Sequence, residues 1–349
     1  MRAARWHRAL DVRIEDVPAP MPGRDEVLVR IERAGICGTD LEEYLDGPVT
    51  IPVGWRHPTS GRQAPLTLGH ELVGTVVDVG PGVTEPIMGR VVPNVVVGCG
   101  ECWWCARHQE GICPKVSVRG LNADGGLAEY IVSDAQSSVA LPSHVDVDVA
   151  AFAAPVAIAV RAMAKVPSLA GSTVAVVGAG VIGLLVAQLA MIGGAVTVLA
   201  VDPIRSRRDL ASFWGAVACT PDLAVEQIAE LTDGRGADIV IECAGAPGTL
   251  SSAIDLSRPG GTIVLVGFHA GAEPIPLLSV VLEERQLLGS AGHLWDVDIT
   301  SAVALLARDA LDVRPLISAV IPLTDTVDKG FERLRTDRDT LKILVDPSA

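Results

Sequence analysis

The sequence predicts an α/β protein in which a β-rich segment, residues 1 to about 150, precedes a doubly wound parallel sheet, residues 151 to about 288. Short β-branched runs separated by proline and glycine turns predict the first part. From about residue 151, strand-like runs alternate with helix-like runs, as in a sheet that helices cover on both faces. The uncharged stretch 171 to 201 shows this alternation most plainly, because it divides into strand, helix and strand.

The same uncharged stretch is long and apolar enough for a membrane helix. Glycines interrupt it, however, and β-branched runs stand at both of its ends, so we expect a buried βαβ unit and no membrane partner. The glycines are Gly178, Gly180, Gly183, Gly193 and Gly194.

Composition and charge exclude several classes of partner. With 349 residues, of which 49% are hydrophobic, the chain can bury a large core and form about two domains. Its net charge of -14 argues against nucleic acid and anionic membranes, because both bind basic surfaces. Residues 1 to 17 carry charges throughout and lack the apolar region of a signal peptide, so we expect a cytoplasmic protein without disulfides.

Four of the seven cysteines lie within residues 98 to 113, "GCGECWWCARHQEGIC", with the spacing C-x2-C-x2-C-x7-C. Four thiolates in one loop can surround Zn2+ as a tetrahedron and leave no position for a substrate, so we expect a structural zinc site. An iron-sulfur cluster and a set of buried cysteines without metal are the alternatives. The four residues are Cys99, Cys102, Cys105 and Cys113.

A second metal site is predicted upstream, in "GICGTDLEEY" (35–44) and "LGHELVGTVVDVG" (68–80). Cys37 and His70 are a mixed thiolate and imidazole pair that binds zinc without saturating it, as catalytic zinc requires. Glu71 can join them only if the chain leaves the regular strand there, because neighbouring strand residues face opposite ways. Glu71 is therefore either a third ligand or a residue that contacts the ligands without binding the metal. Asp40, three residues after Cys37, is placed to orient the histidine.

A nucleotide-binding turn is predicted at "VGAGVIG" (177–183), between the strand "TVAVVG" and the helix "LLVAQLAMIG". Its glycines allow a tight turn, a close approach of the backbone to a pyrophosphate, and close packing of helix on strand. The predicted cofactor-binding residues of this turn are Gly178, Gly180, Val181, Ile182 and Gly183.

Asp202 ends the following strand, where a carboxylate accepts the ribose hydroxyls of NAD and repels a 2'-phosphate. This position favours NAD. NADP stays an alternative, because Arg205, Arg207 and Arg208 follow directly and a guanidinium can bind a 2'-phosphate.

Together with "DGGLAEY" (124–130), "IECAG" (241–245) and "LKILV" (341–345), these motifs resemble the zinc-containing medium-chain dehydrogenases/reductases of the alcohol, sorbitol and threonine dehydrogenase type. The resemblance covers essentially the whole chain. The insertion 45–71 between the two zinc motifs most resembles the 2,3-butanediol dehydrogenase branch.

This resemblance implies a GroES-like β-rich catalytic domain (1–150) with a structural zinc lobe, a Rossmann NAD-binding domain (151–288), and a C-terminal segment (289–349) that returns to the catalytic domain. It also implies an active site between the domains, two zinc ions per chain, and a homo-oligomer that is a dimer or a tetramer. The implied reaction passes a hydride between NAD(H) and a secondary alcohol or ketone, such as a small diol, polyol or cyclitol, with zinc as Lewis acid.

The resemblance also assigns residues. Thr39 takes the substrate proton, and Glu42 stands where relatives commonly have the histidine of a proton relay. Arg207 packs over the adenine. Candidates for lining the substrate pocket are Tyr44, Trp55, Leu127, His293 and Trp295, and we count Tyr44 with the catalytic group.

Two positions depart from the sorbitol-type pattern. Ala154 replaces a glutamate that lies before the proline and close to the metal, and Arg161 stands where a histidine is common. These changes keep two alternatives open. One is a reductase of a specialised-metabolite ketone that uses NAD(P)H; the other is a non-catalytic nucleotide-binding relative with a decayed metal site.

Overall fold

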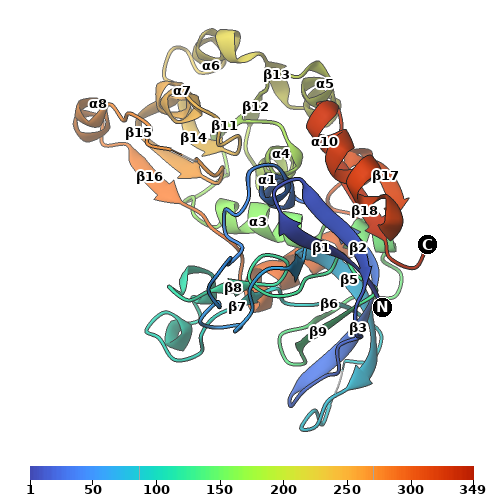
Figure 1. Cartoon of the computed structure of the whole chain (residues 1–349). Coiled ribbons are helices and arrows are strands. Elements are labelled where there is room, and N and C mark those ends of the chain that lie inside the picture. Colours follow the sequence, from blue (N-terminus) through green and yellow to red (C-terminus); the bar gives the residue numbers. More distant parts are fainter. Residues whose placement is uncertain (86, 270) are drawn as a thin grey trace. The chain divides into compact units, whose positions relative to one another are not determined.

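The computed structural model describes residues 1–85, 87–269 and 271–349, and the chain divides into two compact units (Figure 1). The first unit contains residues 1–157 and 292–349, and the second contains residues 158–291. The division falls inside one continuous helix, α3 (Ala153–Met163).

The first unit is built on a seven-stranded sheet with the order β10-β6-β5-β3-β18-β17, in which β9 also pairs with β3. A three-stranded sheet, β2-β1-β4, and a strand pair, β7-β8, accompany it. The strands are β1 (Arg2–Arg8), β2 (Asp11–Asp16), β3 (Glu26–Gly35), β4 (Leu66–Thr67), β5 (Glu71–Val79), β6 (Arg90–Val92), β7 (Val96–Val97), β8 (Ser117–Val118), β9 (Tyr130–Asp134), β10 (Val139–Ala140), β17 (Ile317–Pro322) and β18 (Lys342–Asp346).

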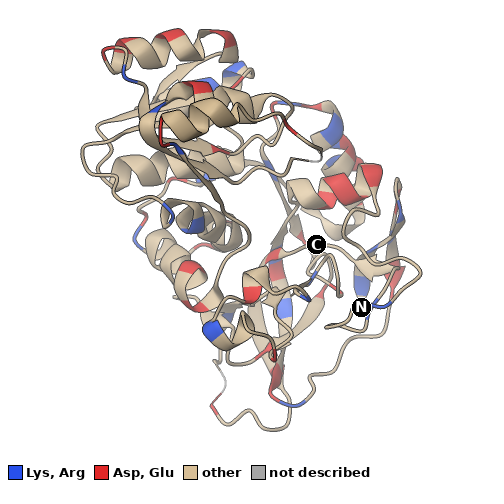
Figure 2. Ribbon diagram, turned by 90° about the vertical axis from the view of Figure 1, so that its left-hand side faces the viewer, with Lys and Arg blue, Asp and Glu red and all other residues tan. Residues whose placement is uncertain are grey.

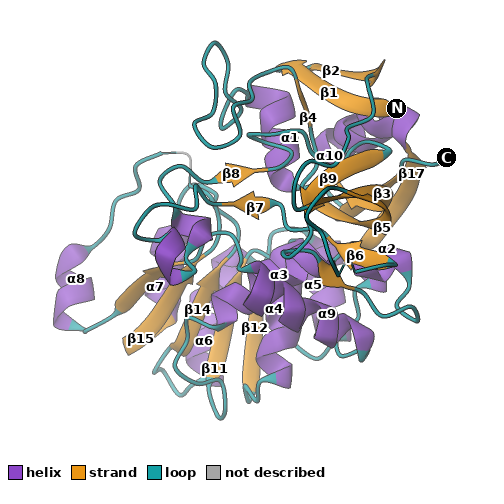
Figure 3. Cartoon of the chain, turned by 90° about the horizontal axis from the view of Figure 1, so that it is seen from below, coloured by secondary structure: helices purple, strands orange, loops and turns teal. Residues whose placement is uncertain are grey.

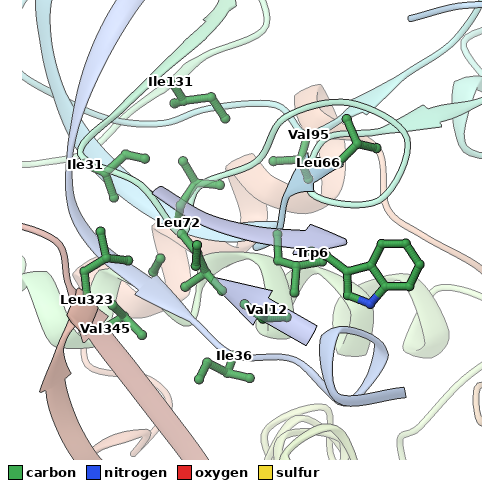
Figure 4. Close-up of a cluster of buried hydrophobic side chains, with 14 of the residues drawn as sticks. Trp6, Val12, Ile31, Ile36, Leu66, Leu72, Val95, Ile131, Leu323 and Val345 are labelled. Carbon is green, nitrogen blue, oxygen red and sulfur yellow. The ribbon is translucent and has the colours of Figure 1, made fainter. Parts of the chain in front are cut away.

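The C-terminal strand β18 lies inside this sheet. It pairs antiparallel with β3, so that Leu344 is opposite Gly35, and parallel with β17. Strands from the two ends of the sequence therefore share one sheet and one core. Figure 4 shows this core, with the fully buried Trp6 and residues such as Ile31, Leu72 and Val345 from different strands.

Short helices connect the strands of the first unit. The helix α1 (Gly38–Asp46) follows β3, and its first backbone amides are capped because the side chain of Asp40 accepts a hydrogen bond from the Cys37 amide. The remaining helices are α2 (Val147–Ala150), the start of α3, α9 (Thr300–Ala307) and α10 (Glu332–Thr336).

A buried carboxylate in α1 fixes the loop that follows it. Glu43 is fully buried, and its two oxygens accept hydrogen bonds from the backbone amides of Val49, Thr50 and Ile51. The base of the loop is closed farther along, where the Ala64 amide donates to the Pro52 carbonyl over 2.8 Å. The loop from 48 to 64 is thus held at both ends.

The second unit is a six-stranded sheet with the order β13-β12-β11-β14-β15-β16, and each neighbouring pair is parallel. The order reverses between β11 and β14, which defines a doubly wound Rossmann sheet. Helices α4, α6 and α7 pack against its strands (Figure 3). The elements are β11 (Thr173–Val177), α4 (Val181–Ile192), β12 (Thr197–Val201), α5 (Arg205–Phe213), β13 (Val217–Cys219), α6 (Ala224–Leu231), β14 (Ala237–Glu242), α7 (Thr249–Leu256), β15 (Ser257–Leu265), α8 (Leu277–Leu282) and β16 (Gln286–Gly289).

The uncharged stretch 171–201 forms β11, α4 and β12, with all five residues of β11 buried. Within the described residues, no helix combines the length and the apolar character that crossing a bilayer requires. Figure 2 shows blue basic and red acidic positions scattered over both units of a mostly uncharged ribbon.

Candidate functional site

The structure brings Cys37, His70 and Glu71 together in the first unit, with their ligand atoms all within 4.8 Å of one another. Cys37 lies between the end of β3 and the start of α1. Glu71 is the first residue of β5, opposite Gly35 at the end of β3, and a Cβ at that glycine would clash with the Glu71 carboxylate.

His70 precedes β5, so the regular alternation of side chains begins only after it. Gly69 has φ of 94°, a conformation that glycine adopts without strain, and it turns the chain before the histidine. His70 and Glu71 can therefore face one point, which the alternation of a regular strand would forbid.

Asp40 connects the elements that carry these ligands. Its fully buried carboxylate accepts hydrogen bonds from the amides of Cys37, at 3.0 Å, and Gly69, at 3.1 Å. The same carboxylate lies 3.4 Å from Nδ1 of His70, which leaves Nε2 as the nitrogen available to a metal. Burial lowers the pKa of His70, but the negative charges of Asp40 and Cys37 outweigh burial and hold the pKa well above its usual range.

Lys342 approaches the site from β18, and the sequence analysis did not predict it. Its Nζ lies 2.6 Å from Oε2 of Glu71 and donates to the Ile36 carbonyl over 3.0 Å. Both charged side chains of the pair are about 95% buried. Burial lowers the pKa of Lys342, and the neighbouring carboxylate of Glu71 and the thiolate of Cys37 raise it above its usual value.

The donor set fits zinc. A thiolate, an imidazole and a carboxylate are ligands that Zn2+ accepts together, and three protein ligands leave one position for water or substrate. The second oxygen of Glu71 is available to the metal, since Lys342 engages Oε2. The three side chains therefore lie close enough to hold one metal ion together and leave one position open.

Other residues named from the sequence lie around this set. Thr39 is half-buried, and its Oγ1 lies 3.9 Å from the Cys37 sulfur. Glu42 is half-buried and follows Thr39 by three positions in α1, on the same side of the helix. Ala154 is buried near the start of α3.

His293 is 5% exposed, and its Nδ1 is buried without a hydrogen-bond partner among the described residues. Burial, and to a smaller extent the charge of His70, lower the pKa of this histidine to about 4. His293 is therefore a neutral imidazole at physiological pH, in the electrostatic neighbourhood of the ligand set.

The four clustered cysteines also converge, with their sulfur atoms within 4.8 Å of one another. The Cys102 sulfur lies 3.5 Å from that of Cys105 and 3.7 Å from that of Cys113. A hydrogen bond from the Cys105 amide lowers the pKa of Cys102 to about 7, whereas burial raises the pKa of Cys105 to about 12. Four sulfurs at these separations suit one tetrahedral ion, as predicted for a closed zinc site.

In the second unit, the turn after β11 has the shape that a pyrophosphate requires. Gly178 has φ of 90°, and a Cβ on Gly183 would clash with the Gly178 carbonyl. Gly180 is the N-cap of α4, and a Cβ there would meet only the end of Arg207. The backbone is thus open where the first amides of α4, from Val181 and Ile182, face outward.

Asp202 follows β12 and lies beside this turn. It is 3% exposed, and its carboxylate accepts hydrogen bonds of 2.8 Å from the amides of Ala179 and Ile204. The guanidinium of Arg207 lies 3.8 Å from the same carboxylate, while Arg208 donates to the Asp202 carbonyl. Each carboxylate oxygen keeps a second lone pair for a ribose hydroxyl.

Comparison with known proteins decides the family. Two family models match, "Alcohol dehydrogenase GroES-like domain" over residues 23–143 and "Zinc-binding dehydrogenase" over residues 181–308. The chain is similar to the (R,R)-butanediol dehydrogenase of Bacillus subtilis (strain 168), with 35% identity over 356 aligned residues that cover 100% of both chains. The chain belongs to the zinc-binding alcohol dehydrogenases.

Solved structures agree with this assignment. The crystal structure of 2R,3R-butanediol dehydrogenase from Bacillus subtilis matches with a TM-score of 0.92 and 33% identity over 99% of each chain. A putative zinc-binding dehydrogenase from Sinorhizobium meliloti 1021, bound to NADP, matches with a TM-score of 0.89 and 32% identity over 99% of each chain. This zinc-binding dehydrogenase is thus an α/β oxidoreductase with a GroES-like and a Rossmann domain, and it acts on CH–OH groups.

Tyr44 has different surroundings from those expected of a catalytic residue. Its ring stacks on Phe331, with 4.9 Å between centroids, and its hydroxyl donates to Glu332 over 2.8 Å. Burial, and then the hydrogen bond to Glu332, raise the pKa of Tyr44 to about 12. These contacts give it a packing role in the first unit, and we leave it out of the proposed mechanism.

The dehydrogenase has a further buried carboxylate, Glu242, at the end of β14. Its Oε1 accepts hydrogen bonds from the amides of Ala244 and Gly245, and its Oε2 lies 3.1 Å from Nε2 of His269. Glu242 thereby fixes the loop "CAGA" at the carboxyl end of the sheet. The sequence motif "IECAG" contains Glu242, but it does not indicate the partner His269, which lies 27 residues farther along the chain.

Proposed function

We propose that this dehydrogenase oxidises a secondary alcohol with NAD as acceptor and reduces the ketone in the reverse direction. The convergence of Cys37, His70 and Glu71 within 4.8 Å carries this proposal, because it is a ligand set with room for a substrate oxygen. When bound there, zinc supplies Lewis-acid polarisation of the alcohol or carbonyl oxygen, and nicotinamide accepts or returns the hydride.

Other side chains of this protein hold the metal ligands in position. Asp40 holds the two ligand-bearing segments through the Cys37 and Gly69 amides and orients His70. Lys342 offsets the charge of Glu71 and keeps its carboxylate in place. These buried contacts preorganise the ligands, so that substrate binding needs little rearrangement.

In the proposed proton path, the Thr39 hydroxyl accepts the proton of the substrate hydroxyl and donates its own proton toward Glu42, as the hydride leaves the carbinol carbon. Glu42, one turn along α1, then receives a proton and passes it to solvent. Its half-buried position supports this role, because the side chain is partly exposed to solvent. A carboxylate relay favours a lower pH range than a histidine relay would.

We propose NAD as the physiological cofactor and two zinc ions per chain. The buried carboxylate of Asp202 supports NAD, because it would repel a 2'-phosphate. The neighbouring Arg207 is the group on which NADP binding would depend, and it lies 3.8 Å from that carboxylate. The two ligand groups, one of three residues and one of four cysteines, support one catalytic and one structural ion.

For the substrate, we propose a small diol or polyol. The full-length similarity to (R,R)-butanediol dehydrogenase supports this class. Reduction of a bulkier ketone is the second candidate, and the small side chain of Ala154, where sorbitol-type relatives have glutamate, favours it. Three converging ligands weigh against the third alternative, a non-catalytic protein with a decayed metal site.

We further propose a homo-oligomer that assembles through the β16 edge of the second unit. β16 ends the sheet, and the adjoining α8 exposes large apolar side chains, with Leu278 73% and Leu282 72% exposed. A second copy of the same edge would cover them. We also propose a cytoplasmic setting, because four thiolates that hold a metal ion require a reducing environment.

One experiment tests the reaction. We would measure NADH formation from 2,3-butanediol, sorbitol and threonine, and NADH consumption with acetoin and a cyclic ketone, together with zinc content. Turnover of a diol with NAD and two zinc ions per chain is expected. Turnover only of the cyclic ketone would support the reductase, and no turnover with one zinc ion would contradict the proposal.

A further inference from the structure

Glu242, the last residue of β14, holds two loops at the carboxyl end of the parallel sheet. Its side chain accepts hydrogen bonds from the amides of Ala244 and Gly245, in the loop that follows β14. Its backbone carbonyl accepts from the amides of Val266, at 2.8 Å, and Gly267, at 3.1 Å, in the loop that follows β15. Since β14 and β15 are neighbouring strands, this one residue ties the two loops together.

The two loops are also in close contact with each other. Gly245 has φ of 62°, and a Cβ there would clash with the backbone of Phe268. A Cβ on Gly267 would clash with the Gly245 amide nitrogen. The loops can approach this closely only because both positions are glycine, so a displacement of one loop is passed to the other.

His269 provides the remaining contact of the Glu242 carboxylate. Among the described residues, the one hydrogen-bond partner of Oε2 is Nε2 of His269, at 3.1 Å. Because an ionised carboxylate only accepts hydrogen bonds, the ring proton lies on Nε2. Glu242 is fully buried, and the side chain of His269 is 16% exposed. A buried carboxylate oxygen without a partner is costly, so the imidazole stabilises the carboxylate in this position, and through it both loops.

The loop after β14 also touches the nucleotide-binding turn. A Cβ on Gly178, whose φ is 90°, would lie only 2.8 Å from the Cβ of Ala244. The turn has a second anchor in β12, because the Gly178 amide donates to the Val201 carbonyl over 2.8 Å. The turn therefore keeps this anchor when the loop beside it changes.

The strand order indicates which half of the cofactor these loops face. A doubly wound sheet binds a dinucleotide across the point where its strand order reverses, with one nucleotide on each side. Here the order reverses between β11 and β14 (Figure 1). Asp202, the proposed ribose acceptor of the adenosine half, follows β12 and belongs to the β11–β13 side. The loops held by Glu242 and His269 belong to the β14–β16 side, which leaves the nicotinamide half for them.

We propose that Glu242 and His269 are positioning residues for the nicotinamide half of the cofactor. The pair keeps the loops after β14 and β15 in the arrangement that this half contacts. The role rests on the proposed use of NAD(H) as cofactor, and not on the identity of the substrate. Loss of the His269 donor should therefore weaken binding of the whole dinucleotide and spare binding of its adenosine half.

Calorimetric titration of the zinc-loaded enzyme with NADH and with AMP tests this role. AMP contains only the adenosine half, so its binding also reports that the nucleotide turn is folded. In His269→Leu, which lacks the donor, NADH should bind about tenfold or more weakly, as for loss of a hydrogen bond to a charged group, whereas AMP affinity should change by less than about twofold. His269→Gln should restore NADH binding, because its amide nitrogen can donate in place of Nε2.

A double-mutant cycle tests whether the two residues act as a pair. The combination of Glu242→Gln and His269→Leu should weaken NADH binding by less than the product of the separate effects. Arg258→Leu is the matched control, since it breaks the contact of 2.7 Å between Arg258 and Asp238 at the amino end of the same strand. This control should leave the ratio of NADH affinity to AMP affinity unchanged. The two His269 variants decide the outcome if Glu242→Gln does not fold.

An equal fall of NADH and AMP affinity in His269→Leu, or an unchanged NADH affinity, would overturn the proposal. If the unsubstituted enzyme binds NADPH and not NADH, the cofactor assignment is wrong instead, and NADPH and its adenosine half, 2',5'-ADP, then replace the two probes. Binding of neither dinucleotide would contradict the proposed function, and with it the role of the pair.

Discussion

Lys342 and Glu71 form a buried ion pair, with 2.6 Å between Nζ and Oε2, although 271 residues separate them in the sequence. The pair joins the last strand of the chain to the first residue of β5, next to His70. Replacement of either partner alone leaves one buried charge without compensation.

Lys342→Met should therefore destabilise the zinc-free protein by about 3–5 kcal/mol, the usual cost of breaking a buried ion pair. Zinc should reduce this loss, because the metal also offsets the charge of Glu71. Urea unfolding with and without a chelator measures both effects. Lys342→Arg keeps the charge and is the control; equal unfolding midpoints for Lys342→Met and the unsubstituted protein would contradict the assignment.

The cysteine lobe should stabilise the fold and take no part in the reaction. Cys102→Ser opens the four-thiolate set, so we expect loss of one zinc ion per chain and a lower thermal midpoint. Metal analysis and calorimetric unfolding measure these changes. Activity per folded molecule should be retained, and a folded variant with one zinc ion but no activity would show that the lobe is not only structural.

Asp202→Ala should weaken NAD binding and improve NADP binding, because it removes a ribose acceptor and a negative charge beside Arg207. Fluorescence titration with NADH and NADPH gives both dissociation constants. Asp209→Ala, an exposed acidic residue of α5, serves as the control. Tighter binding of NADPH than NADH by the unsubstituted protein would exclude our cofactor assignment.

Ala154→Glu should tighten zinc against a chelator by roughly ten- to hundredfold and shift the pH profile of oxidation upward, since it returns a negative charge to the neighbourhood of the metal. The glutamine of Ala154→Gln has the size of glutamate without its charge, so this variant separates the effect of the charge from the effect of the larger side chain. If zinc affinity stays constant while stability falls, Ala154 only packs the start of α3, where an unpaired carboxylate is costly.

Tyr44→Phe should lower stability by about 1 kcal/mol through loss of the hydrogen bond to Glu332, with kcat unchanged. The pKa of Tyr44 is raised from 10.0 to about 12 in the fold, so the unfolded chain releases the phenol proton first. The resulting stability is complete below pH 10 and is lost as pH rises toward 12. In Tyr44→Phe, this loss of stability at alkaline pH should be absent, as urea unfolding between pH 8 and 12 would show. A large fall in kcat would return Tyr44 to the catalytic group.

The sequence predicted the features that depend on short spacing. The glycines of 178–183 and the four cysteines of 99–113 each lie within one turn or loop, so their spacing alone indicates a phosphate-binding turn and a four-thiolate metal site. Cys37 and His70 were paired because a thiolate and an imidazole form a mixed zinc ligand set, and they come together because they flank the ends of β3 and β5, which pair antiparallel.

Features that depend on distant pairing could not be predicted in this way. Lys342 reaches Glu71 only because β18 joins the sheet beside β3. Tyr44 was named as a candidate for the substrate pocket and counted with the catalytic group. Its partners Phe331 and Glu332 come from the far end of the chain, and no local pattern indicates them.

The anchored loop after α1 also makes the enzyme convenient to engineer. Glu43 fixes the backbone at Val49 to Ile51, and the bond from Ala64 to Pro52 closes the base. Within the loop, the hydroxyls of Thr59 and Ser60 donate to the carbonyls of Lys115 and Asn122, and His57 is buried. Substitutions should therefore be tolerated best at the exposed positions 53–56, which include Trp55, because they leave all of these contacts in place.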